Sequence, residues 1–275
     1  MILEEIVAHK QAEVAQAQRL VSLRELQMLA EEAPPPRNFA AVLRGPKVRV
    51  IAELKRASPS EGRLVSAGDL WDPRIIAQEY SGSGAAALSV LTDEKYFDGE
   101  LFTLRRARRY MPLPVLRKDF ILSEYQVWES RVHFADALLL IARLLSDEQL
   151  RDYLDLATQL GMGALVESHD ERDMERVAGS GATVVGINNR DLDTLAVDLA
   201  TTQRLAPLAP RDCVLVSESG IATEADVARL AQMGVQAVLV GTALVRAPDP
   251  HALLRRLSGV YRPGYEPAPD PQAES

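Results

Sequence analysis

An acidic and a basic side chain stand two positions apart in the stretch IAELKRASPSEG, residues 51 to 62. If this stretch begins as a β-strand, Glu53 and Lys55 point to the same face as Ile51, because side chains alternate between the two faces. A protonated amine can donate a proton to a carbonyl oxygen or bind an anion, and a nearby carboxylate helps to keep it protonated. The pair is therefore a first candidate for acid–base chemistry.

Further ionisable and amide side chains follow apolar runs later in the chain. Lys118 lies near the end of LPVLRKD, Glu167 near the end of GALVES, and Asn188 near the end of TVVGINN. A single glutamate in such a place is more often a solvated loop residue, but several of these groups at one rim favour an active site. A lysine there can donate a proton, or it can attack a carbonyl and form a Schiff base. The residue types do not separate these two routes.

Two glycine-containing stretches, SESGI and LVGTAL, carry residue types that bind phosphate. Ser219 and Gly220 lie in the first, and Gly241 and Thr242 lie in the second. Glycine lets backbone N–H groups approach an anion, and a helix that begins after such a loop adds partial positive charge. The alternative is a pair of ordinary tight turns. Together with the lysines and glutamates, these stretches indicate chemistry on a sugar phosphate.

The framework for these residues is predicted by eight apolar runs that suit buried parallel strands. The runs are VRVIAELK, AALSVLT, LPVLRKD, DALLLIA, GALVES, TVVGINN, CVLVSES and QAVLVGT. Amphipathic helical stretches such as DEQLRDYLDLATQLG separate them. Eight such units predict an α/β fold, the TIM (β/α)8 barrel, whose active sites form at the carboxyl ends of the strands. An open doubly wound sheet is disfavoured, because no G-x-G-x-x-G follows the first strand.

The first 45 residues differ from the repeating part of the chain. The stretch ILEEIVAHKQAEVAQAQR has helical apolar spacing, and a second helix is expected from about Leu23 to Glu31, before PPP breaks it. We therefore expect a helical extension over residues 1–45 that packs on the barrel, and the barrel itself over residues 46–260. The Pro-rich, polar segment 261–275 is expected to be a disordered tail.

Composition restricts the classes of partner. The chain has 275 residues, a net charge of −8 and one cysteine. The negative charge argues against non-specific nucleic-acid binding. Cys213 cannot form an internal disulfide and suits a reducing cytoplasm, and no apolar run is long enough for a membrane span. The four histidines lack metal-ligand spacing. We expect a cytoplasmic protein with no nucleic-acid partner, no membrane partner and no metal.

Several of these stretches resemble the motifs of one enzyme family, indole-3-glycerol-phosphate synthase. The stretches VIAELKRASPSEG, LSVLTDEKYFDG, VLRKDF, LVESH, GINNRDL, SESGI and VLVGTAL occur in the family's order, over roughly residues 37 to 258. The resemblance implies a TIM barrel with an additional N-terminal segment. It implies conversion of 1-(2-carboxyphenylamino)-1-deoxyribulose 5-phosphate to indole-3-glycerol phosphate, carbon dioxide and water, without cofactor or metal. The expected partner is this anionic sugar phosphate, and the expected state is a monomer or weak dimer.

The same resemblance implies roles for the charged residues. Lys118 would be the general acid that protonates the substrate's ketone while the anthranilate ring carbon attacks it. Glu167 would handle the later proton transfers. Lys55 would hold an anionic group or donate a proton in a later step, and which lysine acts at which step stays open. Glu53 and Asn188 would orient these groups through hydrogen bonds.

The resemblance also implies substrate contacts. The polar contacts are Ser58, Arg190, Ser219, Gly220, Gly241 and Thr242. The walls around the aromatic ring are Phe97, Phe120, Leu139 and Leu192. Without the resemblance, these four apolar residues are better explained as core. One departure is Phe134 in HFADALLL, at a position where the family more often has glycine.

Two other functions stay open on the residues alone. One is another phosphate-binding barrel enzyme, such as an isomerase or a Schiff-base aldolase. An isomerase would use Cys or Asp at the strand ends, whereas Cys213 stands at the start of its predicted strand. An aldolase would be inactivated covalently by borohydride in the presence of substrate. The other is a barrel that only binds a phosphorylated ligand, which would tolerate changes at Lys118 and Glu167.

Overall fold

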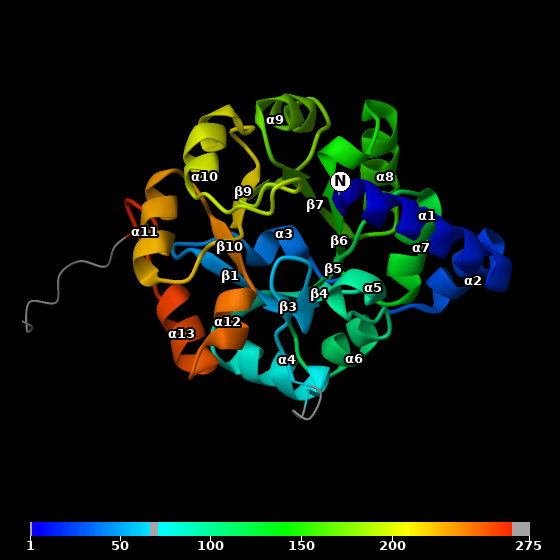
Figure 1. Ribbon diagram of the computed structural model, residues 1–275, viewed down its shortest axis with the longest axis horizontal. Helices are drawn as coiled ribbons and strands as arrows, with labels where there is room; N and C mark the ends of the chain where they lie inside the picture. Colours follow the sequence, from blue (N-terminus) through cyan, green and yellow to red (C-terminus); the bar gives the residue numbers. More distant parts are fainter. Residues whose placement is uncertain (1, 67–70, 266–275) are drawn as a thin grey trace, which may run out of the picture.

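Eight parallel strands form a closed barrel (Figure 1). The computed structural model describes residues 2–66 and 71–265. The barrel strands are β1 (Arg49–Leu54), β4 (Ala85–Leu91), β5 (Val115–Lys118), β6 (Ala137–Ile141), β7 (Gly163–Ser168), β8 (Val184–Asn188), β9 (Val214–Glu218) and β10 (Ala237–Val240). They follow one another around the barrel in chain order, and β1 pairs with both β4 and β10. The predicted TIM barrel is confirmed, and each apolar run contains one strand.

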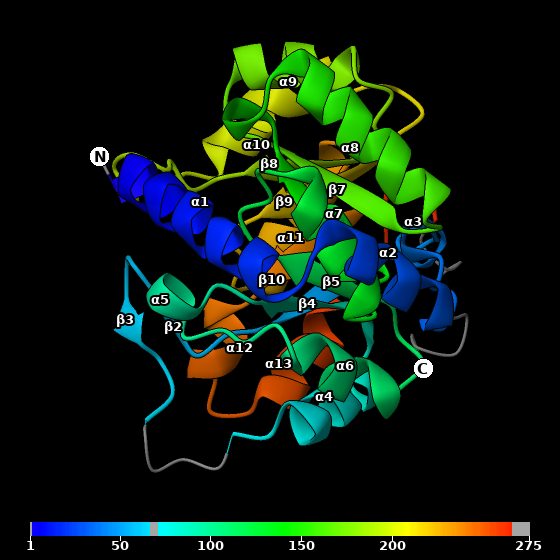
Figure 2. The same cartoon turned by 90° about the vertical axis from the view of Figure 1, so that its right-hand side faces the viewer.

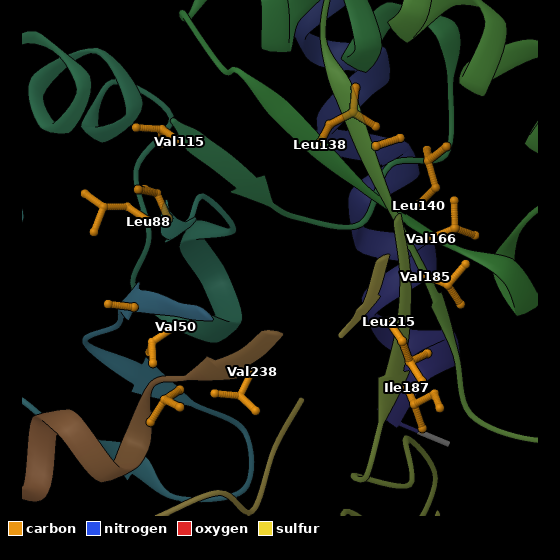
Figure 3. Close-up of a cluster of buried hydrophobic side chains, with 14 of the residues drawn as sticks. Val50, Leu88, Val115, Leu138, Leu140, Val166, Val185, Ile187, Leu215 and Val238 are labelled. Atoms are coloured by element: carbon orange, nitrogen blue, oxygen red, sulfur yellow. The ribbon is translucent and has the colours of Figure 1, made fainter. Parts of the chain in front are cut away.

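The strand side chains alternate between two apolar layers, as expected for strands that are covered on both faces. Val50 and Ala52 belong to the layer between the strands and the surrounding helices, and Figure 3 labels Val50 among other members of this layer. Ile51 belongs to a second cluster inside the barrel, together with Leu116. Because Glu53 follows Ile51 by two residues, the alternation aims Glu53 at the barrel interior.

The helices that come after β1 in the chain follow individual barrel strands, as Figure 1 shows. They are α4 (Pro73–Gly82), α5 (Glu94–Phe97), α6 (Thr103–Arg109), α7 (Glu124–Val132), α8 (Asp147–Gln159), α9 (Glu171–Ala178), α10 (Ala200–Leu205), α11 (Glu224–Gln232), α12 (Thr242–Arg246) and α13 (Pro250–Leu257), with 3-10 turns at Ala142–Leu144 and Ala206–Leu208. Local sequence fixes several starts: Ser146 and Gln149 form a capping box at α8, which satisfies otherwise unpaired N–H groups. Two short strands, β2 (Ala57–Ser58) and β3 (Gly62–Arg63), pair as a hairpin after β1.

A short helix, α3 (Phe39–Val42), closes the amino end of the barrel. Phe39 and the following Leu43 are buried in the interior cluster. Gly163, the first residue of β7, lies against Phe39, where an added Cβ atom would approach the Phe39 Cβ to 3.3 Å. Apolar side chains therefore fill this end of the barrel, and polar chemistry is left to the carboxyl end.

The two predicted N-terminal helices are confirmed as α1 (Ile2–Leu20) and α2 (Leu23–Glu32). Both contact α7, and α1 also lies beside α5 (Figure 2). Ile6 reaches the interior cluster, and Glu5 accepts a hydrogen bond from Tyr96 Oη at 3.0 Å. Because α5 follows β4, α1 lies over the carboxyl end of the barrel.

Lys10 of α1 is fully buried, with 0% of its side chain exposed. Its Nζ lies 2.9 Å from Asp93 Oδ2 and 3.0 Å from Asp119 Oδ1, two residues that follow β4 and β5. Burial by itself lowers the pKa of Lys10, but the surrounding carboxylates outweigh burial and raise the pKa above its ordinary value. One permanently protonated ammonium group therefore joins α1 to two loops at the carboxyl end.

The end of the described chain stays close to the start of β1. Lys47 forms an isolated bridge with Tyr261, and Arg262 N donates to Pro46 O at 2.9 Å. Most of the tail expected to be disordered, residues 266–275, lies outside the described residues. The domain boundaries at residues 45 and 260 stay predictions. Within residues 2–66 and 71–265, no helix has both the length and the apolar character needed to cross a membrane.

Candidate active site

A cavity of about 440 Å³ lies at the carboxyl ends of the barrel strands. Its lining includes these predicted site residues: Glu53, Lys55, Phe97, Lys118, Phe120, Leu139, Glu167, Asn188, Arg190, Leu192, Ser219, Gly220, Gly241 and Thr242. Ser58 is the exception, because it is buried in β2, with its Oγ 3.4 Å from Ser60 Oγ and outside this lining. The fold therefore gathers residues from β1 through α12 into one cavity.

Lys118, the last residue of β5, holds the central position among the charged groups. Its Nζ donates to Glu167 Oε2 at 2.7 Å and lies 3.0 Å from Glu218 Oε2. Burial lowers the pKa of Lys118, but these two carboxylates and that of Glu53 outweigh burial and raise the pKa above its ordinary value. The amine is therefore protonated and able to serve as a proton donor.

Glu167, in β7, is buried and is contacted on both carboxylate oxygens. Asn188 Nδ2 donates to Oε1 at 3.2 Å, and Lys118 occupies Oε2. His169 Nε2 lies 3.1 Å from Oε1. Burial by itself raises the pKa of Glu167, yet the contacts with Lys118 and His169 hold the pKa well below its ordinary value. Glu167 is therefore an ionised carboxylate that can accept a proton.

Glu218, the last residue of β9, lines the same cavity although the sequence analysis did not select it. It is 1% exposed, and its Oε2 lies 3.0 Å from Lys118 Nζ. Burial raises the pKa of Glu218, Lys118 lowers it, and the charge of Glu167 raises it further, to about 8. Of the two carboxyl groups, Glu218 therefore keeps a proton more readily than Glu167 does. Its position at the end of an apolar run was the signal that could have revealed it.

Two glycines leave room for the buried carboxylates. A Cβ atom added at Gly186 in β8 would overlap Glu218 Oε1, and one added at Gly241 would overlap Glu53 Oε1. Glu53 Oε1 lies 3.3 Å from Lys55 Nζ. The acid–base pair that alternation indicated therefore faces the cavity from the end of β1.

One wall of the cavity is apolar. Phe97 of α5 and Phe120, which follows β5, have ring centroids 6.2 Å apart. Leu139 of β6 and Leu192 add aliphatic side chains to the lining. Such a wall suits a planar aromatic group, since aromatic rings pack favourably in tilted or offset arrangements.

The loops after β9 and β10 are referred to below as the glycine loops, and they comprise residues 219–220 and 241–242. Ser219 and Gly220 have φ angles of 68° and 78°, a left-handed backbone that is uncommon for serine. Asn189 Nδ2 supports this conformation by donating to Ser219 O at 3.1 Å. Gly241 immediately precedes α12. Small residues in both loops leave the backbone accessible, as an anion site requires.

Two guanidinium groups add positive charge to the cavity. Arg246 Nη2 lies 2.7 Å from Glu61 Oε2, and Arg190 Nη2 lies 3.9 Å from Glu61 Oε1. Arg190 also donates through Nη1 to Leu195 O at 2.9 Å. Because both guanidinium groups share one carboxylate, this part of the cavity keeps a positive balance.

His169 is expected to make stability depend on pH. Burial lowers its pKa, but Asp173 and Glu167 outweigh burial and raise the pKa from 6.5 to about 8. A raised histidine pKa contributes stability that is complete below about pH 6.5 and is lost as the pH rises through about 8. The contribution is about 2 kcal/mol at most, because one pKa unit corresponds to about 1.4 kcal/mol.

This expectation is measured by denaturant unfolding of the wild type and of His169→Gln. The difference between their free energies of unfolding should shrink by about 2 kcal/mol between about pH 6 and about pH 9. A difference that stays constant over this range would mean that the His169 ring is not charged in the folded protein.

The fold and the cavity together define the class of protein. A protonated amine between buried carboxylates, with an aromatic wall and the glycine loops around it at the carboxyl end of a TIM barrel, belongs to an acid–base enzyme. Comparison with known proteins gives the family. Residues 3–257 match the family model described as indole-3-glycerol phosphate synthase, and the chain belongs to this family.

Relatives with this name are similar over nearly the whole chain. The indole-3-glycerol phosphate synthase of Dehalococcoides mccartyi is 47% identical over 261 residues, which are 94% of this chain and 100% of that protein. The one from a Nocardioides species is 46% identical over 259 residues, 94% of this chain and 98% of that protein. The chain is therefore an enzyme, a carboxy-lyase of tryptophan biosynthesis that acts on a sugar-phosphate substrate.

Solved structures of other enzymes share the barrel. A 3-hexulose-6-phosphate synthase from Salmonella typhimurium has a TM-score of 0.62 at 14% identity, covering 77% of this chain and 97% of that one. A thiamine phosphate pyrophosphorylase from Pyrococcus furiosus has a TM-score of 0.55 at 16% identity, covering 77% of this chain and 94% of that one. At these identities the likeness concerns the fold alone. The family membership, not this likeness, decides against the isomerase, the aldolase and the non-catalytic barrel.

Proposed function

We propose that Lys118 is the general acid of ring closure and that Glu167 accepts a proton in the last step. The supporting observation is one ammonium group held between two buried carboxyl groups, Glu167 at 2.7 Å and Glu218 at 3.0 Å. The ring carbon that bears the carboxylate attacks the substrate's ketone. A carbon–carbon bond forms, and the ketone oxygen takes a proton from Lys118 and becomes a hydroxyl.

The two later steps follow from the same arrangement. When carbon dioxide leaves, the electron pair of the broken bond restores the aromatic ring. Loss of water then needs a proton on the departing hydroxyl and removal of a proton from the neighbouring carbon. Ionised Glu167 accepts the carbon-bound proton, and Asn188 keeps its carboxylate in place. Lys55 protonates the hydroxyl, or Lys118 does so after it has taken up a second proton from water, since both amines line the cavity.

The substrate's two anionic ends are proposed to bind on opposite sides of this centre. The phosphate would lie at the glycine loops, near Arg190. The carboxylate would lie near Lys55, whose amine is 3.3 Å from Glu53. The aromatic ring would lie against Phe97 and Phe120, because this wall is the apolar part of the cavity. Bound at three places, the ring carbon is held close to the ketone, which favours attack.

Glu218 is proposed to act through its charge. While Glu218 is protonated, Lys118 faces only one charged carboxylate, that of Glu167, and the cavity tolerates an anionic substrate. Once Glu218 ionises, near its pKa of about 8, an added negative charge repels the phosphate and the carboxylate. We expect kcat/KM of the wild type to fall above about pH 8, and we expect this alkaline limb to disappear in Glu218→Gln.

The test is the pH profile of kcat/KM for both proteins, followed through the absorbance of the indole product. Glu61→Gln is the matched control, because it removes a carboxylate from the same cavity that does not contact Lys118. It should keep the alkaline limb. If Glu218→Gln kept the limb with an unchanged midpoint, Glu218 would not be the titrating group.

The enzyme is further proposed to work in the cytoplasm as a monomer or weak dimer, without nucleic-acid or membrane partners. The cavity supports this state, because one chain provides the acid, the base, the aromatic wall and the glycine loops. The buried, unpaired Cys213 supports a reducing compartment. Analytical ultracentrifugation at increasing protein concentration measures the oligomeric state.

A further inference from the structure

A second cavity, of about 700 Å³, lies between α4 and α6. The segment that follows α2 and Phe134 also line it. Figure 2 shows α4 and α6 side by side in this part of the molecule. The lining residues are Pro34, Arg37, Arg74, Phe102, Arg105, Arg106, Arg108, Arg109, Tyr110 and Phe134. Six of them are arginines, three are aromatic and none is acidic. This composition is unusual for a surface of a protein whose net charge is −8.

The second cavity is separate from the catalytic one. The two share no lining residue. Arg108 Nε donates to Asp136 Oδ1 at 3.0 Å, and the backbone N–H of Arg37 donates to the same oxygen at 2.7 Å. Asp136 immediately precedes β6. The arginine-lined cavity therefore lies toward the amino ends of the strands, whereas the catalytic cavity lies at their carboxyl ends.

Carboxylates offset only part of this positive charge. Asp72 accepts from Arg74 Nη2 at 2.5 Å and lies 3.6 Å from Arg106 Nη2. Asp136 pairs with Arg108. Two aspartates thus serve three guanidinium groups, and the other three lining arginines are not offset in this way.

Arg37 and Arg105 contact carbonyl oxygens instead of carboxylates through their guanidinium groups. Arg37 Nη1 donates to Leu113 O at 2.6 Å, and Arg105 Nη2 donates to Val132 O at 2.7 Å. Within the described chain, Arg105 Nε is buried without a hydrogen-bond partner. Burial lowers the pKa of Arg105. Burial and the charge of Arg108 together lower the pKa of Arg37, and Asp136 offsets only part of this effect. A bound anion would relieve this uncompensated charge.

Aromatic rings lie close to two of the guanidinium groups that no aspartate pairs with. Arg105 lies 4.6 Å above the ring of Phe134, and Arg109 lies 6.0 Å from the ring of Tyr110. Phe134 has a φ of 67°, a backbone conformation that favours glycine and is strained for a bulky residue. The chain therefore has a strained phenylalanine whose ring supports Arg105.

We propose that the arginine-lined cavity binds an anion that carries several phosphoryl groups, either an inorganic oligophosphate or the phosphate chain of a nucleotide. A guanidinium group can donate two parallel hydrogen bonds to the oxygens of one phosphate. These hydrogen bonds are stronger than neutral ones, because both partners are charged. Several phosphoryl groups are favoured, because six arginines line the cavity and only two aspartates pair with them. Phe102, which is 50% exposed, offers a ring face on which a base could stack.

The test is isothermal titration of the full-length protein with sodium tripolyphosphate, without divalent metal. Arg105→Gln/Arg109→Gln should weaken binding at least about tenfold, because it removes two charged donors. Its kcat and KM for the sugar-phosphate substrate should not change. Arg151→Gln/Arg211→Gln, which removes two exposed arginines elsewhere, is the matched control and should bind as the wild type does. Arg109→Gln alone tests the site if the double variant does not fold, with an expected loss of about threefold.

Titration with adenosine triphosphate distinguishes the two sources of the phosphate chain. Tighter binding than tripolyphosphate, lost in the same variant, identifies a nucleotide whose base stacks on the exposed Phe102 ring. Equal affinity identifies the phosphate chain alone. The proposal is overturned if neither anion binds at about 1 mM. It is also overturned if binding is unchanged in the arginine variants and is displaced by the sugar-phosphate substrate, because the anion would then occupy only the catalytic cavity.

Discussion

Replacing Lys118 with alanine is expected to lower kcat by about a hundredfold to ten-thousandfold, the usual contribution of a positioned proton donor. Its amine is the group nearest to both Glu167 and Glu218. Without it, the ketone oxygen has no charged donor at this place, and two carboxyl groups meet without a cation between them. The kcat of Lys118→Arg should fall almost as far, because the guanidinium group is larger and does not release its proton.

The measurement is steady-state kinetics with the sugar-phosphate substrate, with circular dichroism to check the fold. Lys47→Ala is the matched control, since Lys47 lies over the Tyr261 ring, away from the cavity. A loss of less than about tenfold in a folded Lys118→Ala protein would remove Lys118 from the chemistry. Borohydride with substrate should leave no covalent adduct, because the proposed mechanism has no Schiff base.

Replacing Lys10 with methionine is expected to lower the free energy of unfolding by about 3 to 5 kcal/mol. The change removes the ammonium group that lies 2.9 Å from Asp93 and 3.0 Å from Asp119. Both aspartates are buried, and Asp93 would keep no cation at hydrogen-bond distance among the described contacts. Among the described contacts, Asp119 would keep Arg117 as its only cationic partner. A buried carboxylate without its partner is costly, and methionine has no charge to offer Asp93 or Asp119.

Urea unfolding of the wild type and Lys10→Met measures this loss. Lys95→Met is the matched control, because Lys95 is a partly exposed lysine of the same rim that pairs with Glu5 at 3.4 Å. Such a surface pair contributes less than about 1 kcal/mol. If Lys10→Met were no less stable than Lys95→Met, the buried ammonium group would not be the link between α1 and the barrel.

The strands and the acid–base pair at the end of β1 could be predicted from the sequence because local periodicity determines them. Parallel strands covered on both faces leave continuous apolar runs, and each of these runs became a barrel strand. Alternation after Ile51 was enough to place Glu53 and Lys55 on the interior side. The aromatic wall needed the resemblance to a known family, since Phe97 and Leu139 do not differ from core residues in local pattern.

Contacts between distant segments could not be predicted in this way. Lys10 and Glu13 are a common pair on a helix surface, and nothing near them indicates that Asp93 and Asp119 complete the cluster. Glu218 stands between two serines and resembles a loop residue until the register pairs it with Asn188. Its raised pKa depends on burial beside Glu167, a property of three dimensions.

The arginine-rich stretch TLRRARRY was similarly uninformative. In a sequence, such a run is typical of a solvated helix face. Only the packing of α6 against α4 and the segment after α2 encloses these arginines in a cavity with Arg37 and Phe134. The strained φ of Phe134 likewise has no local signature beyond the departure from glycine.

The pairing of β1 with β10 has a consequence for how the enzyme is made. Ala52 pairs with Val240, so Glu53 stands beside Gly241, and groups from the two ends of the barrel sequence meet at one seam. A chain that has not yet added β10 leaves the edges of β1 and β9 open to wrong pairing with other chains. The last strand to be synthesised therefore both covers the open edges of β1 and β9 and brings Gly241 beside Glu53.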